Sequence, residues 1–461
     1  MTILAAFMVP HPPLIIPDVG KGGEEQIRAT IDAYENIASQ IAELRPETII
    51  ITSPHAVMYA DYFHISDGKG ATGSFSRFGA SQVSFKETYD TELRDEICAL
   101  ADEMQFPAGV LGERDKNLDH GVMVPLYFIR KKYNDFRILR SGLSGLALSD
   151  HYRYGMMIRK AIEKTGRKCV IIASGDLSHK LQEYGPYGYA AEGPQYDRRI
   201  MDVMGKAAFG ELLEFGESFC DKAAECGHRS FVIMAGAFDG MAVEAKAYSH
   251  EDVTGVGYGI CSFYPLGKDE NRHFLDDYMK RQEEELKRKT EEADPYVKLA
   301  RKSLESFILR REIIAVPDDI PEEMRTKKAG TFVSLHKEGK LRGCIGTISP
   351  VRSCVAEEII YNAVSAAARD PRFSPVRADE LKWLEISVDE LSEPEAIDTA
   401  DQLDVKRYGV IVSKGARRGL LLPDLEGVDT VEDQINIAMN KAGIHSYEDV
   451  RLERFEVIRH T

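Results

Sequence analysis

The chain has 461 residues, 43% of them hydrophobic and 29% charged, which predicts two soluble domains rather than one core. Its formal net charge of −16 argues against a nucleic-acid-binding surface, which needs clustered lysine and arginine. No uncharged segment reaches the ~18 residues of a membrane helix, and the apolar N-terminus lacks the basic region of a signal peptide. Seven cysteines without CxxC spacing fit a reducing compartment, so we expect a cytoplasmic protein without disulfides.

The first part of the chain alternates apolar runs with an amphipathic pattern. Residues 2–8 (TILAAFM), 48–52 (TIIIT) and 169–173 (CVIIA) predict short buried strands. Over residues 27–44, apolar side chains recur every three or four positions, as they do in a helix. Buried strands separated by helices indicate an α/β domain with a mixed central sheet that helices cover on both faces.

Histidines follow each of these three strands. His11 comes after the first strand, His55 after TIIITSP, and His179 after CVIIASGDLS. We expect these residues to lie together, because ligands of open α/β sheets bind at the carboxyl ends of strands. Two imidazoles and one carboxylate commonly hold Fe(II), so we predict His11 and His55 as ligands. Glu225, which precedes the apolar stretch FVIMAGAF, is our choice of third ligand.

Two further motifs carry histidines. His120 lies in LDHGVMVPL and His179 in SGDLSHK. With a reference pKa of about 6.5, a histidine in either place can take and return protons beside a metal. Each can equally be a structural hydrogen-bond partner. Residues 68–73 (GKGATG) match GxGxxG, but no convincing helix follows, so we expect a flexible loop there.

The character of the chain changes near residue 267. A charged segment over 268–292 predicts a helical linker between a first domain, 1–267, and a second, 293–461. The second domain mixes strand and helix patterns, which predicts a smaller α+β fold; its expected strands are 330–335, 384–388, 409–413 and 419–422, and its expected helices are 296–308 and 430–441.

The second domain contains the heptapeptide LRGCIGT. Cys344, which follows a glycine, is a candidate reactive thiol on a tight turn, or a small buried residue. By spacing alone, Arg342, Arg369 and Asp370 are candidates for a polar pocket around it.

In order, the motifs PHPP, TSPH, LDHGVMVPL, SGDLSHK and a glutamate ahead of IMAGA resemble the class III extradiol ring-cleavage dioxygenases. These are the LigB-type catalytic subunits, and the resemblance covers about residues 1–265. It implies Fe(II)-dependent opening of a catechol-type aromatic ring by O2. It also implies iron ligation by His11, His55 and Glu225, with His179 as acid/base and His120 lining the oxygen and substrate pocket.

One segment departs from that pattern. The sequence ECGHR resembles the Memo proteins, where a cysteine in a C-G-R-H motif is the apparent third ligand. Cys226 therefore competes with Glu225, and His228 is a further candidate. A thiolate ligand would make the metal site softer and could change the reaction.

The second domain resembles the AMMECR-type domains across about residues 293–460. Such proteins and Memo-like proteins are associated with a radical-SAM protein, which implies a separate partner because this chain has no CxxxCxxC motif. Two alternatives to ring cleavage stay open: a metal-dependent C–C bond cleaving or redox enzyme that does not use O2, and a non-catalytic metal-binding adaptor. Extradiol relatives often associate as subunits, so a homo-oligomer is a further expectation.

Overall fold

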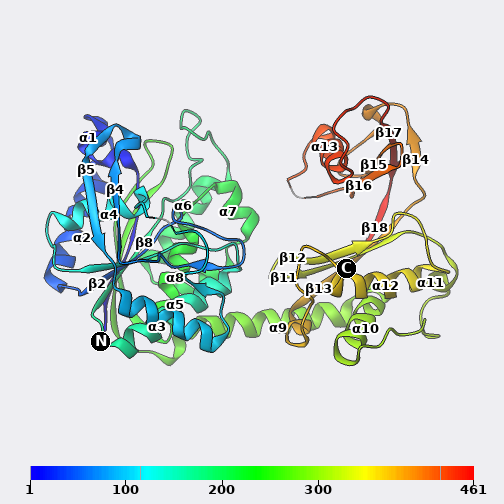
Figure 1. Ribbon diagram of the computed structural model, residues 1–461, viewed down its shortest axis with the longest axis horizontal. Coiled ribbons are helices and arrows are strands. Elements are labelled where there is room, and N and C mark those ends of the chain that lie inside the picture. The colour runs from blue at the N-terminus through cyan, green and yellow to red at the C-terminus, as the bar shows by residue number, and fades with distance from the viewer. Residues whose placement is uncertain (1, 115, 426) are drawn as a thin grey trace. The chain divides into compact units, whose positions relative to one another are not determined.

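The computed structural model describes residues 2–114, 116–425 and 427–461. The chain divides into two compact units, Met1–Met279 and Lys280–Thr461 (Figure 1). The division falls inside helix α9 (Phe274–Glu292), which occupies most of the charged segment predicted as a helical linker. Among the described helices, none combines the length and the apolar character that crossing a membrane requires.

A six-stranded sheet lies in the middle of the first unit, in the order β7-β2-β8-β1-β10-β9. Strands β7, β2, β8 and β1 run parallel, whereas β10 and β9 are antiparallel. This mixed sheet confirms the predicted α/β class. The strands are β1 (Ile3–Val9), β2 (Thr48–Thr52), β7 (Arg137–Ser141), β8 (Cys169–Ser174), β9 (Met241–Glu251) and β10 (Tyr258–Lys268).

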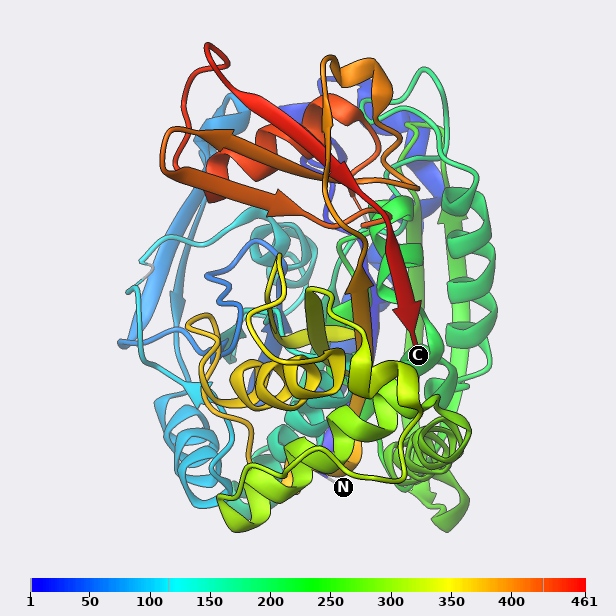
Figure 2. The ribbon, with the colours of Figure 1, turned by 90° about the vertical axis from the view of Figure 1, so that its right-hand side faces the viewer.

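Helices cover both faces of this sheet (Figures 1 and 2). Successive residues of a strand point to opposite faces, so Ile50 packs into one core while Ile49 and Ile51 pack into the other. This is why TIIIT is apolar without interruption. One core contains residues of α3 (Thr91–Met104), α5 (Leu148–Thr165), α6 (Glu192–Gly205) and α8 (His228–Ala237), and the other contains residues of α2 (Arg28–Leu44) and α4 (His120–Arg130).

The GKGATG segment does not form the loop that its sequence predicts. Gly70 begins strand β4 (Gly70–Phe75), which pairs antiparallel with β5 (Ala80–Thr88). Gly70 and Gly73 are needed for packing: a Cβ at Gly70 would lie 2.2 Å from the carbonyl oxygen of Glu87, and one at Gly73 would lie 2.7 Å from Met123 Sδ. The glycines therefore permit close approach within the fold rather than a phosphate-binding turn.

The second unit contains two four-stranded antiparallel sheets, β12-β11-β13-β18 and β14-β17-β15-β16. Helices α10 (Pro295–Arg310) and α12 (Val355–Ala368) pack on the first sheet, and α13 (Val431–Lys441) on the second. The predicted α+β class is confirmed. The strands are β11 (Thr331–Lys337), β12 (Lys340–Gly346), β13 (Leu384–Leu391), β14 (Glu395–Ile397), β15 (Gly409–Lys414), β16 (Arg417–Leu421), β17 (Arg451–Phe455) and β18 (Val457–His460).

Candidate metal centre

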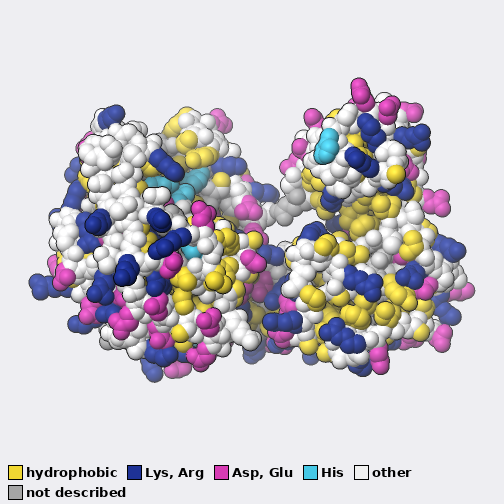
Figure 3. Space-filling model, viewed as in Figure 1, with side chains coloured by type: hydrophobic (Ala, Val, Ile, Leu, Met, Phe, Trp, Pro, Cys, Tyr) yellow, Lys and Arg dark blue, Asp and Glu magenta, His cyan; other side chains and the backbone are white. Residues whose placement is uncertain are grey.

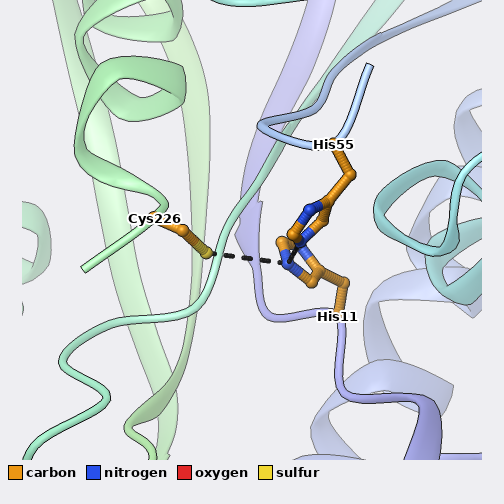
Figure 4. A group of neighbouring side chains, drawn as sticks. All are labelled: His11, His55 and Cys226. Atoms are coloured by element: carbon orange, nitrogen blue, oxygen red, sulfur yellow. Dashed lines mark hydrogen bonds between the residues drawn. The ribbon is translucent and has the colours of Figure 1, made fainter. Parts of the chain in front are cut away.

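Side chains that can bind a metal gather at the carboxyl edge of the parallel strands. His11 follows β1 and His55 follows β2, the two neighbours of β8 in the sheet. The Nε2 atoms of these two rings lie 3.0 Å apart, and Cys226 Sγ lies 3.6 Å from His11 Nε2. Figure 4 shows the two rings together, with Cys226 approaching from the opposite side. All three donor atoms are within 4.8 Å of one another, as ligands of one ion must be.

Hydrogen bonds set the orientation of His11. Its Nδ1 lies 3.0 Å from the Ser174 hydroxyl, which donates its own proton to the carbonyl of Gly121 at 2.6 Å. Ser174 must therefore accept the Nδ1 proton of His11, which leaves Nε2 with a free lone pair toward Cys226. The backbone holds the same position, because the His11 amide donates to Asp176 at 2.7 Å and the Tyr34 hydroxyl donates to the Pro10 carbonyl.

The LDHG motif places His120 beside this pair. Asp119 caps helix α4 and also accepts a hydrogen bond from the Ser53 hydroxyl at 2.6 Å. Gly121 is required there, since a Cβ would lie 2.3 Å from Ser53 Oγ. The start of α4 is thereby tied to the loop after β2, and the His120 ring lies 4.0 Å, centre to centre, from the His55 ring.

The SGDLSH motif packs against the start of α8. Gly175 and Gly227 touch so closely that a Cβ on Gly175 would lie 2.0 Å from Gly227 Cα. The Asp176 amide donates to Cys226 Sγ at 3.3 Å, and the Cys226 amide donates to the Asp176 carbonyl. Asp176 Oδ2 lies 3.9 Å from His179 Nε2, and Asp176, His179 and Cys226 form a second group of possible ligands.

Glu225, the predicted third ligand, lies outside both groups of possible ligands found among the described residues. Its carboxylate accepts a hydrogen bond from the backbone amide of His228 at 2.6 Å, and burial raises its pKa to about 7. The His228 ring is buried between the Tyr196 hydroxyl and the Leu212 carbonyl. The geometry thus groups the alternative ligand, Cys226, with the two imidazoles.

The electrostatics of the cluster suit a cation. Burial, followed by the neighbouring His11, lowers the pKa of His55 to about 4 and that of His120 to about 3, so both rings are neutral at pH 7. Burial and Asp176 raise the pKa of Cys226 well above its usual range, so the thiol keeps its proton unless a cation compensates the thiolate. Two imidazoles and one thiol, as in His11, His55 and Cys226, are a donor set that iron, zinc and copper accept.

Sequence reasoning missed three residues that shape the site. Asp176 and Ser174 lie in the SGD segment already singled out for its histidine, and an acid directly after a buried strand was a usable signal. Tyr187, which stacks on His179 with ring centres 5.1 Å apart, had no such signal. Figure 3 shows histidine side chains gathered at the surface of the first unit.

The candidates in the second unit have a different setting. Cys344 lies within strand β12 and not on the predicted turn. It accepts a hydrogen bond from the Ser334 hydroxyl at 3.2 Å, and burial raises its pKa. Asp370 contacts it as expected, accepting from its amide at 2.9 Å, but the arginine that binds Asp370 is Arg372.

Arg342, the other candidate of the second unit, is bound by structural partners. Its guanidinium donates to Glu380 at 3.0 Å and to the Ser374 carbonyl at 2.9 Å. These bonds connect β12 to the segment after α12.

Comparisons with known proteins match both units. The family model described as catalytic LigB subunit of aromatic ring-opening dioxygenase matches residues 5–261, and the AMMECR1 model matches residues 297–460. These matches confirm the two resemblances that the motifs indicated.

Individual relatives cover the whole chain or one part of it. A Clostridium acetobutylicum protein is 42% identical over 468 residues, which is 100% of this chain and 99% of that protein. A Thermotoga maritima protein is 51% identical over 168 residues, 36% of this chain and 97% of that protein. The crystal structure of an uncharacterized Pyrococcus horikoshii protein, PH0010, is 33% identical and covers 36% of this chain and 88% of that one, with a TM-score of 0.34.

Proposed function

Because this chain belongs to the family of the catalytic LigB subunit of aromatic ring-opening dioxygenase, we propose that its first unit opens a catechol-type aromatic ring with O2. Its ligands for one Fe(II) are His11, His55 and Cys226. The observation that carries the proposal is the convergence of these three donor atoms, within 4.8 Å of one another, at the carboxyl edge of the sheet.

When bound, ferrous iron would hold a catecholate and O2 side by side and pass electrons between them. The protein supplies a ligand set that is closed on one side and open on the other. His11 is only 1% exposed and cannot move without breaking its hydrogen bonds to Ser174 and Asp176. Part of the His55 residue lies at the surface although its ring is partly desolvated, so substrate can approach from its side.

A catechol must lose protons to bind a metal, and His179 is the group that takes one at Nε2. The Asp176 carboxylate, 3.9 Å from that nitrogen, stabilises the imidazolium that results. His120 plays a different part because its pKa of about 3 keeps it neutral. It therefore positions a substrate hydroxyl by accepting a hydrogen bond, and it supplies no proton at pH 7.

The grouping of Cys226 favours a second candidate. A thiolate is a softer donor than a carboxylate, and Glu225 is engaged with the backbone of α8. A metal held by this set could instead support C–C bond cleavage or redox chemistry without O2, together with a separate radical-SAM partner. Activity under argon that is abolished by a chelator would favour this candidate over ring cleavage.

The test begins with full-length protein purified without oxygen and loaded with Fe(II). Mixed with a panel of catechols in air-saturated buffer, it should consume O2 and form the yellow absorbance of a ring-opened semialdehyde. The His11→Ala variant should do neither, since it lacks the most firmly held ligand. Absence of O2 uptake across the panel, with iron demonstrably bound, would refute ring cleavage.

A matched pair of variants tests the third ligand. Cys226→Ala should bind Fe(II) far more weakly than the parent chain, whereas Glu225→Gln should retain the metal, because Glu225 contacts the His228 amide. Iron content, measured after gel filtration, decides between them. If Glu225→Gln lost the metal and Cys226→Ala retained it, the third ligand would be the Glu225 carboxylate.

A further inference from the structure

Cys226 belongs to two groups of donor atoms and not to one. The first group joins it to His11 and His55, and the second joins it to Asp176 and His179. Within each group every donor atom lies within 4.8 Å of the others. The Cys226 sulfur is therefore a possible ligand in both of the neighbouring sets.

The two sets of possible ligands adjoin each other. Asp176 Oδ2, from the second set, lies 4.0 Å from His11 Nε2, from the first. Asp176 is 8% exposed, and its Oδ1 atom is committed to the His11 amide, which leaves Oδ2 toward His179.

We propose that Asp176, His179 and Cys226 form a second metal position, adjoining the first and sharing its thiolate. The inference rests on the proposed function, because it assigns a second role to the residue that accepts the substrate proton. A donor set of one carboxylate, one imidazole and one thiolate suits a borderline divalent ion such as Zn(II) or Co(II).

The charges and protons balance without any redox step. Binding of the first ion displaces the Cys226 proton to solvent and leaves a thiolate. The second ion then meets two negative charges, the Asp176 carboxylate and the shared sulfur, together with the imidazole nitrogen of His179. These anions offset the repulsion between two adjacent cations, as buried charges require.

Filling the second position changes the reaction at the first. His179 cannot bind a metal through Nε2 and accept a substrate proton at the same atom. One equivalent of metal therefore activates the site and a second equivalent inhibits it. Metal binding at the second position thus inhibits the reaction, because it occupies the acid/base residue His179.

The experiment counts Zn(II) bound by the full-length protein after chelator treatment, by titration against a chromophoric competitor. The parent chain should bind two equivalents. His179→Ala and His55→Ala should each bind one, because each removes a ligand of one position only. His120→Ala is the matched control, since its imidazole belongs to neither group, and it should still bind two. Circular dichroism melts establish that each variant is folded.

Co(II) gives a readout that does not depend on activity. The first equivalent should produce a thiolate-to-metal absorption band. The second should reduce the electron paramagnetic resonance signal per ion, because two ions that share one sulfur couple magnetically. Inhibition of the Fe(II)-loaded parent chain by added Zn(II) should be weakened about 10- to 100-fold in a His179→Gln variant, measured relative to that variant's own rate.

The outcomes separate this inference from the function on which it rests. One equivalent in both the parent chain and His179→Ala would overturn the second position while leaving the first intact. A second outcome is that the parent chain binds one equivalent of Zn(II) and that both His55→Ala and His179→Ala lose it. This would indicate a single ion held by all five ligands and would also overturn the second position. Two equivalents in a protein that never consumes O2 would refute ring cleavage and keep the two-ion site.

Discussion

Cys226 in the first unit and Cys344 in the second are both half-buried, and each has a glycine neighbour. The chain surrounds them differently. Cys226 lies in a loop, and its sulfur lies close to His11 and His55, which follow strands β1 and β2. Cys344 lies within a strand, where its contacts are a serine hydroxyl on the neighbouring strand and an aspartate that accepts from its amide.

The difference shows what makes a cysteine a candidate ligand. Burial raises the pKa of both thiols, so neither is a thiolate by itself. Of the two, Cys226 has imidazoles close enough to share a cation with it, and a shared cation is what would remove its proton.

The largest effect on Zn(II) affinity is expected when each of the two cysteines is replaced by alanine in turn. Cys226→Ala should lower the affinity of the full chain for Zn(II) by about 100-fold or more, because it removes a direct ligand. Cys344→Ala is the control and should leave that affinity unchanged. Competition titration measures both. Equal losses in the two variants would remove the distinction between the cysteines.

A smaller effect is expected at Ser174, which accepts the Nδ1 proton of His11. Ser174→Ala frees the ring to rotate and should weaken Zn(II) binding about 10- to 100-fold. Ser334→Ala, which removes the hydroxyl beside Cys344, should have no effect on Zn(II). If Ser174→Ala bound Zn(II) as tightly as the parent chain, the orientation of His11 would not depend on this hydrogen bond.

The second unit should respond to acid through Asp370. Arg372 lowers the pKa of Asp370 to about 2, below its ordinary value of 3.8. A lowered pKa stabilises the fold above about pH 4, and this contribution is lost as the pH falls toward 2. Screened by solvent, it amounts to about 1–2 kcal/mol. Relative to the parent chain, Asp370→Asn should be less stable by that amount at pH 7 and by a smaller amount at pH 3, where the parent chain has already lost part of the contribution.

Fluorescence of Trp383 measures this change in the second unit alone, because the chain has one tryptophan. Urea unfolding followed at this residue, at pH 7 and pH 3, gives the free energy of unfolding. Equal acid sensitivity in Asp370→Asn and the parent chain would show that Asp370 does not carry the effect.

The smallest effects are expected at two helix caps, one in each unit. Asp119 caps α4 and Asp294 caps α10, so each change to alanine should cost about 1 kcal/mol of the free energy of unfolding. Asp119→Ala should also weaken metal binding, because Asp119 ties the loop of His55 to α4 through Ser53. Thermal melts and Zn(II) titration of the two variants test the contrast; metal affinity that falls in Asp294→Ala as well would contradict it.

The sequence predicted the framework of the site because that information is local. An uninterrupted apolar run located β2 at Thr48–Thr52, and a period of three to four residues located α2 at Arg28–Leu44 to within a residue. Histidines directly after strands could then be assigned to one edge, since parallel strands end together. The choice between Glu225 and Cys226 could not be made in this way, because adjacent residues share every local signal.

Packing between distant segments decides which of the two side chains lies beside the imidazoles of His11 and His55. The contact of Gly175 with Gly227 brings Cys226 against the loop after β8, while the free amide of His228 at the start of α8 attracts the carboxylate of Glu225. Neither contact can be predicted from a local pattern. Gly175 and Gly227 are about fifty residues apart in the chain, and the hydrogen bond of Glu225 depends on where helix α8 begins.

Cys344 also shows that local sequence alone does not decide the structure around a residue. The glycine before it favours a turn by sequence, but Gly343 is in a strand against helix α12, where a Cβ would lie 2.3 Å from the Ala366 carbonyl oxygen. From the sequence alone, most strands and helices of the central sheet and the residues able to bind a metal could be predicted, but not strand β4 in the GKGATG segment or strand β12 around Cys344. The tertiary structure decided which of those residues meet, because side-chain direction and close backbone contact depend on elements far away in the chain.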